Sequence, residues 1–77
     1  MFDIILGYNA DTFTATAYGG DTLRSVLESN DIDYTTGAVH LDAAPIRPGD
    51  LDKTFSEIGV DTEKRHTLIV VKKLNNA

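Results

Sequence analysis

Two histidines are the side chains in this sequence best suited to acid–base or metal chemistry. His40 lies in a short apolar segment, and His66 follows Lys64 and Arg65. A histidine near neutral pH can act as a general base or bind a metal. Neither histidine has a partner at a ligand-like spacing, and the chain has no cysteine. We therefore expect His40 to face solvent or bond a neighbour, and His66 to be a solvated residue at the start of a strand.

Some of the carboxylates occur in pairs that are separated by one residue. There are three such pairs, Asp31 and Asp33, Asp50 and Asp52, and Asp61 and Glu63. A calcium-binding EF-hand loop needs several spaced oxygens, a glycine and a late glutamate, and none of these pairs has that setting. Asp50 is expected instead to cap a helix, and Asp52 to lie in its first turn. No glycine-rich segment leads into Lys-Ser or Lys-Thr, and no spacing provides a base for a nucleophile. The sequence predicts a protein that is not an enzyme, with no catalytic, metal-binding or cofactor-binding residue.

Length and composition indicate one small domain. The chain has 77 residues and no cysteine, so disulfides and thiolate-bound zinc cannot stabilise it. We expect a single domain over residues 1–77, with 75–77 as a frayed tail. The start of the chain lacks the basic and apolar segments of a signal peptide, and no apolar run has membrane-spanning length. A monomeric cytoplasmic protein without membrane contact is expected.

The net charge of −5 is unevenly distributed, because all 12 acidic residues precede Lys64. An acidic chain is a poor binder of nucleic-acid phosphates, so no nucleic-acid partner is expected. The acidity has a simple explanation in solubility. It also permits an acidic inhibitor that mimics nucleic acid and is encoded by a mobile element. The charged face of such an inhibitor would surround the first helix and comprise Asp21, Glu28, Asp31 and Asp33.

The element that must organise the fold is a strand over residues 66–73. Its segment Leu68-Ile69-Val70-Val71 is the longest apolar run, which is typical of a strand covered on both faces. A buried strand is predicted over residues 2–8. Alternating residues over 12–18 predict a half-exposed strand, with Phe13 towards the core.

Two helices are predicted between these strands. Leu23, Val26 and Leu27 form one helical stripe after a cap at Asp21 or Thr22. A second short helix is predicted over residues 51–58, with Asp50 as its cap and Gly59 in the left-handed conformation that follows a helix. Residues 38–41 and a very short segment from Ile46 supply further strands.

This order of elements resembles the β-grasp, or ubiquitin-like, fold. The resemblance implies an α+β domain with a mixed four- to five-stranded sheet, one main helix across one face and a second short helix. Within the superfamily, the spacing is similar to that of small sulfur-carrier proteins. The matching segments are Asp21-Thr22-Leu23-Arg24-Ser25-Val26-Leu27, Val39-His40-Leu41-Asp42-Ala43-Ala44-Pro45-Ile46 and Leu68 to Val71.

The chain departs from the carriers at the position that performs their chemistry. Carriers react at a C-terminal Gly-Gly, whereas no glycine follows Gly59 here. The resemblance therefore implies a non-enzymatic module that binds a protein partner through the exposed sheet face, with a degenerate sulfur-carrier-like subunit as the alternative. The predicted partner-binding residues are Tyr8, Thr12, Thr14, Thr16, Tyr18 and Lys72.

Overall fold

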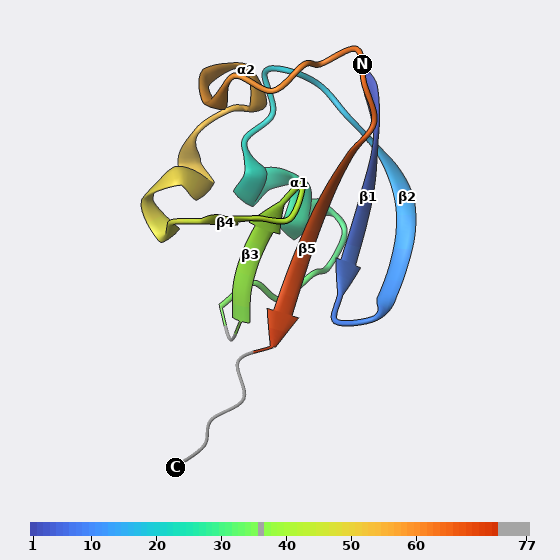
Figure 1. The fold of residues 1–77 in the computed structure, drawn as a ribbon, viewed down its shortest axis with the longest axis vertical. Coiled ribbons are helices and arrows are strands. Elements are labelled where there is room, and N and C mark those ends of the chain that lie inside the picture. Colours follow the sequence, from blue (N-terminus) through green and yellow to red (C-terminus); the bar gives the residue numbers. More distant parts are fainter. Residues whose placement is uncertain (36, 73–77) are drawn as a thin grey trace.

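A computed structural model describes residues 1–35 and 37–72. Their strands form one five-stranded sheet in the order β2-β1-β5-β3-β4. β5 (His66–Lys72) lies at the centre, between β1 (Phe2–Tyr8) and β3 (Gly37–Leu41) (Figure 1). The prediction of a central strand from the apolar run is confirmed.

The sheet is mixed in direction. β1 pairs with β2 (Asp11–Ala17) as an antiparallel hairpin and with β5 in parallel. β3 runs antiparallel to β5 and to the edge strand β4 (Ala44–Ile46). Five strands, one main helix and a second short helix match the predicted ubiquitin-like α+β arrangement.

The helix α1 (Leu23–Ser29) covers one face of the sheet (Figure 1). The hydroxyl of Thr22 accepts a hydrogen bond from the backbone N–H of Ser25, so Thr22 caps the helix. The three predicted stripe residues are buried against the sheet, and they are Leu23, Val26 and Leu27. Burial of this stripe stabilises a helix that is too short to form alone.

The prediction of one helix over residues 51–58 is wrong, because the segment folds as two turns. A 3₁₀-helix, η1 (Pro48–Asp52), is followed by an extended Lys53 and then by α2 (Phe55–Ile58). Asp50 lies inside η1 and does not cap a helix. Pro48 lies at the start of η1, where its fixed φ suits a helix and its missing N–H costs no hydrogen bond, and the extended Lys53 separates the two turns.

α2 has its own cap, which the sequence analysis missed. The hydroxyl of Thr54 accepts from the backbone N–H of Glu57, and the Glu57 carboxylate accepts from the backbone N–H of Thr54. This capping box satisfies two N–H groups at the helix start. The predicted left-handed Gly59 is confirmed, with φ of 96°. The N–H of Val60 bonds the carbonyl of Phe55, so the chain folds back over the helix as expected.

The core lies between α1, α2 and the sheet. Its fully buried side chains are Phe55, Ile4, Leu6, Leu23, Leu27, Leu68 and Val70. The rings of Phe2 and Phe55 meet edge to face, with centroids 5.2 Å apart. No helix in the described ranges is long and apolar enough to cross a membrane.

Candidate functional site

The face of the sheet opposite α1 has no helix over β1 and β5 (Figure 1). Side chains alternate along a strand, so the neighbours of buried core residues point to this side. Their paired positions place the following residues on what we call the open face: Ile5, Gly7, Thr12, Thr14, Thr16, Ala38, His40, Thr67, Ile69 and Val71.

The centre of the open face is apolar. Ile5 and Ile69 are half-buried, and Val71 is 45% exposed. A shallow depression of about 500 Å³ lies here, lined by Ile5, Thr12, His40, Ala43, Thr67, Ile69 and Val71. The hollow therefore spans residues of β1, β2, β3 and β5, which are far apart in the sequence.

Gly7 lies between two residues that line the depression, at a position where a side chain has no room. A Cβ atom at Gly7 would lie 2.7 Å from the Cγ2 atom of Thr12 and 3.1 Å from the Cδ1 atom of Ile69. Both distances are shorter than van der Waals contact, so any larger residue must displace its neighbours. Gly7 keeps Thr12 and Ile69 close together beside an open hollow.

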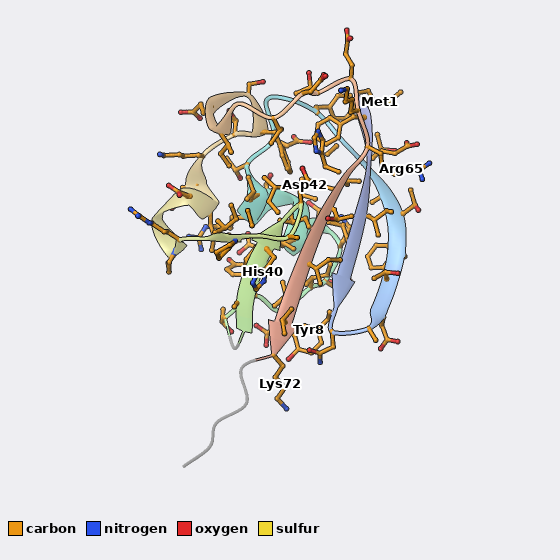
Figure 2. The ribbon with its side chains drawn as sticks, viewed as in Figure 1. Met1, Tyr8, His40, Asp42, Arg65 and Lys72 are labelled. Atoms are coloured by element: carbon orange, nitrogen blue, oxygen red, sulfur yellow. The ribbon has the colours of Figure 1, made fainter. Side chains whose placement is uncertain are left out.

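His40 lines the depression from β3 (Figure 2). Its side chain is half-buried, so it meets the expectation of facing solvent only in part. Its Nδ1 atom is buried and has no hydrogen-bond partner in the described structure. A buried nitrogen without a partner is unfavourable by about 1–3 kcal/mol.

The predicted partner-binding residues divide between the two sides of the sheet. Thr12, Thr14 and Thr16 follow β2 on the open face, as predicted. Tyr18 lies just beyond β2 and is 55% exposed, and its backbone N–H donates to the Asp21 carboxylate. Of the three threonines, Thr12 also lines the depression, whereas Thr14 and Thr16 lie towards the edge of the open face.

Tyr8 and Lys72 do not lie on the open face. Tyr8 has the parity of Leu6 and packs against the core from the helix side. Lys72 has the parity of Val70 and lies exposed at the end of β5 (Figure 2). Because their parity places them on the helix side, neither residue shares a surface with the threonines of β2. Lys73, which was included in the predicted strand, lies outside the described residues.

The sequence analysis missed the apolar centre, namely Ile5, Ile69 and Val71. The alternation of side chains along β1, and along the apolar run in β5, could have identified these residues. If Leu68 and Val70 face a helix, then Ile69 and Val71 must face away from it. The apolar run predicts a strand covered on both faces, so the exposure of its second face was not expected.

The second histidine, His66, is buried and forms an ion pair with the exposed Asp42, so its predicted solvated position is wrong. Its Nδ1 atom lies 2.6 Å from Oδ2 of Asp42, and its Nε2 atom lies 2.6 Å from the backbone oxygen of Asp61. Both partners can only accept, so both ring nitrogens carry protons. Burial lowers the pKa of His66, but the Asp61 carbonyl and the Asp42 carboxylate outweigh burial and raise it. A ring occupied on both sides serves as a structural cation rather than as a base.

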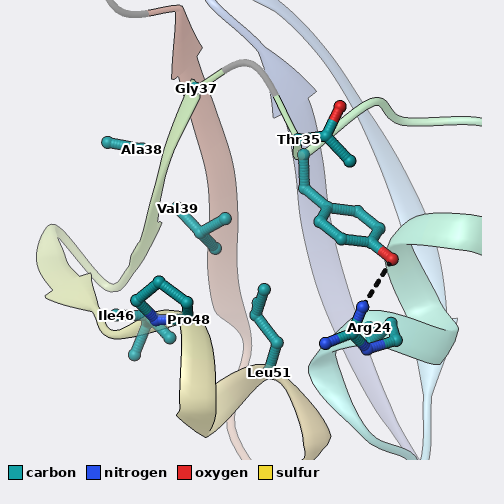
Figure 3. Close-up of a pocket in the computed structure, with 9 residues that line it drawn as sticks. Arg24, Thr35, Gly37, Ala38, Val39, Ile46, Pro48 and Leu51 are labelled. Carbon is teal, nitrogen blue, oxygen red and sulfur yellow. Dashed lines mark hydrogen bonds between the residues drawn. The ribbon is translucent and has the colours of Figure 1, made fainter.

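A second pocket, of about 380 Å³, lies between α1, η1 and β3 (Figure 3). Its cation is Arg24, whose Nε and Nη2 atoms donate to the two carboxylate oxygens of Asp52 at 2.6 and 3.3 Å. The Nη1 atom of Arg24 donates to the hydroxyl of Tyr34, which donates to Glu28. These bonds occupy all three guanidinium nitrogens. The pocket therefore offers a ligand no unpaired cation.

Asp21, Glu28 and Asp33, three of the four acidic residues predicted around α1, make local hydrogen bonds, and Asp31 is exposed. Asp21 accepts from the N–H of Tyr18, Glu28 from the hydroxyl of Tyr34, and Asp33 from the N–H and hydroxyl of Thr35. The two bonds from Thr35 lower the pKa of Asp33. No group of three metal-ligating side chains occurs in the part of the chain that the structure describes.

Comparison with known proteins identifies the fold. No protein-family model matches the chain, and no curated protein matches it in sequence. Among solved structures, it is similar to a ubiquitin-like protein from Trypanosoma brucei. The two share 16% of their residues, the alignment covers 94% of each chain, and the TM-score is 0.65. Similarity at this level of identity shows a shared fold and leaves function to be argued from the site.

Proposed function

We propose that this chain, which has the ubiquitin-like β-grasp fold, is a non-enzymatic module that binds a protein partner through its open face. The observation that carries the proposal is the uncovered apolar centre formed by Ile5, Ile69 and Val71 around the depression. Contiguous exposed apolar surface with a polar rim is typical of protein interaction sites.

The shape and chemistry of the face define the partner. The depression offers an apolar floor to a side chain of the partner, and burial contributes about 25 cal/mol per Å² of apolar area. The threonines of the open face add polar contacts at the rim. A partner with an apolar anchor and polar groups around it fits this arrangement.

A charge placed at the centre tests the proposal. Val71→Glu puts a carboxylate in the apolar patch without touching the core, because Val71 is exposed. The matched control is Ser29→Glu, which adds the same charge at an exposed position on α1. Partners would be isolated from an extract of the native host by affinity purification with the tagged chain, then remeasured as purified proteins by titration calorimetry.

The expected result is a partner that binds the wild-type chain and Ser29→Glu but binds Val71→Glu at least tenfold more weakly, which corresponds to about 1.4 kcal/mol. Equal binding by all three proteins would contradict the proposal. The acidic-inhibitor alternative stays a prediction, and it differs by requiring a partner that is lost at high salt. The alternative of a degenerate carrier subunit also stays a prediction. It would require activation of the C-terminus by an adenylating enzyme.

A further inference from the structure

The outer edge of β2 is an open pairing surface. In the described sheet β2 pairs with β1 on one side only, and no strand lies beyond it. The strand reads Asp-Thr-Phe-Thr-Ala-Thr-Ala and contains no lysine or proline. Natural sheets commonly protect an edge with such residues, because unpaired backbone groups are a template for another chain. β2 lacks this protection along its whole length.

The backbone groups that point outwards can be identified. Tyr8 and Asp11 flank a two-residue turn and are paired across the hairpin, so their backbone groups point at each other. The next residue, Asn9, accordingly donates its N–H to Val70 of β5, on the opposite side of β1. Alternation along β2 then directs the N–H and C=O groups away from β1 at Thr12, Thr14 and Thr16.

The sequence of this edge is self-complementary about Thr14. We propose that two copies of the chain pair antiparallel through β2, with Thr14 opposite Thr14 on a two-fold axis. In this register Thr12 of one copy faces Thr16 of the other, and the outward backbone groups of all these threonines pair. The result is one continuous sheet with a self-complementary interface, which is the commonest kind of dimer symmetry.

The side chains of both faces fit this register. On the open face, threonines lie opposite threonines, a favourable cross-strand pair. On the helix side, Phe13 of each copy lies opposite Ala15 of the other, at positions where side chains approach closely. Phe13 is 45% exposed although it pairs with the buried Leu6, because no strand lies beyond β2 to cover it. A small residue opposite a large exposed ring leaves room for the ring to be covered.

The helices do not block the approach. The groove between β2 and α1 is lined on the helix side by small residues, including Ser25 and Ser29, and by Asp21, which adds a negative charge. Two paired edge strands bury less than a standard interface, so the dimer is weak and dilute protein remains monomeric, as the sequence analysis expects. The net charge of −5 on each copy opposes association. Dimerisation should therefore strengthen when salt is added.

The first experiment measures the mass of the purified chain by sedimentation equilibrium, from dilute protein to about 1 mM, where weak interfaces become populated. The expected result is a mass that rises from 8.4 kDa towards twice that value. Amide NMR shifts should change with concentration at Thr12, Thr14 and Thr16. A mass that stays at the monomer value, or shifts confined to Ile69 and Val71, would overturn the proposal.

Charge pairs test the register itself. Thr14→Lys and Thr14→Glu each place like charges opposite one another, which should weaken self-association about threefold or more. An equal mixture of the two variants places opposite charges on the axis and should restore association. Thr14→Val is the matched control and should associate like the wild type. Equal association by all the single variants, or a mixture no tighter than either variant alone, would exclude pairing at Thr14.

A backbone variant separates the edge from the fold. Thr14→Pro removes an outward N–H that β1 does not use, so it should abolish the dimer and leave the unfolding midpoint in urea near that of the wild type. Ala15→Pro removes an N–H of the β1–β2 ladder and should destabilise the monomer. A dimer that persists in Thr14→Pro would contradict the proposed hydrogen bonds.

Discussion

The carboxylate of Asp42 and the imidazole of His66 form a close ion pair, with Oδ2 2.6 Å from Nδ1. Asp42 lies in the turn after β3 with φ of 51°, and its other oxygen accepts from the N–H of Thr67. The pair therefore joins the β3–β4 turn to the start of the central strand. His66 is 8% exposed, so the ring is shielded from water on most sides.

Stability should decrease as the pH rises past neutrality. The folded-state pKa of His66 is raised above its usual value near 6.5, so its contribution is complete below that pH. It is lost as the pH rises through the folded pKa. Urea unfolding between about pH 6 and pH 9 should show this decline in the free energy of unfolding.

Two variants identify the source of that decline. Asp42→Asn removes the charge but tolerates the positive φ of this turn, so it should lower the pKa of His66 in NMR titrations and flatten the decline. His66→Gln removes the titrating group and should abolish the decline. A decline that survives in both variants would show that another group is responsible.

Because Gly59 has a positive φ after α2, replacing it with alanine should lower the free energy of unfolding more than the same change at Gly20. A Cβ atom at either Gly59 or Gly20 would meet no atom within 4 Å, but only Gly59 has a positive φ, of 96°. Gly59→Ala should therefore lower the free energy of unfolding by about 1 kcal/mol, through backbone strain alone. Gly20→Ala should be neutral or slightly stabilising. Thermal or urea unfolding of both variants measures the difference, and equal losses would rule out strain as the cause.

The phenol of Tyr34 should ionise above its ordinary pKa. Its hydrogen bond to Glu28 and its burial raise the pKa of Tyr34, while the neighbouring Arg24 lowers it. Glu28→Gln should therefore reduce the pKa of Tyr34, and Arg24→Met should increase it. Ultraviolet absorbance titration at 25 °C measures both shifts. The titration curve of Tyr34→Phe is subtracted to remove the signal of the other tyrosines. Shifts in the same direction would contradict the opposed effects of the two neighbours.

Adjacent residues of β5 should differ in their effect on stability. Leu68 is fully buried against the helices, whereas Ile69 is half-buried on the open face. Leu68→Ala should cost about 3 kcal/mol, a large part of the total stability of a domain of this size. Ile69→Ala should cost about 1 kcal/mol, because less of its surface leaves water on folding. Urea unfolding of the two variants is the measurement, and similar losses would mean that the open face is covered.

The fold was predictable where one strong local pattern decided each element. Each of three local features was sufficient to predict its own element. They are the apolar run of β5, the apolar stripe of α1, and Gly59 at the end of α2. The split between η1 and α2 was not predictable from apolar spacing, since it depends on the extended Lys53 and the cap at Thr54. Tertiary contacts decided these positions.

The site was harder to predict, because it depends on which strands become neighbours. The hollow on the open face joins Thr12 of β2 to Ile69 of β5 across Gly7 of β1. No sequence pattern contains that proximity. The burial of His66 likewise depends on Asp42, which is supplied by a turn distant in the chain.

The parallel pairing of β1 with β5 has a consequence for synthesis of the chain. Ile4 lies beside His66, so β1 can complete its pairing only after β5 has been made. Until β5 leaves the ribosome, the β1–β2 hairpin has an unpaired edge on both sides and an uncovered apolar face. Folding is then limited by closure of the long segment between β1 and β5, a slow step for contacts so distant in sequence. Fragments that end before β5 should remain unfolded, and they should need chaperones to stay in solution.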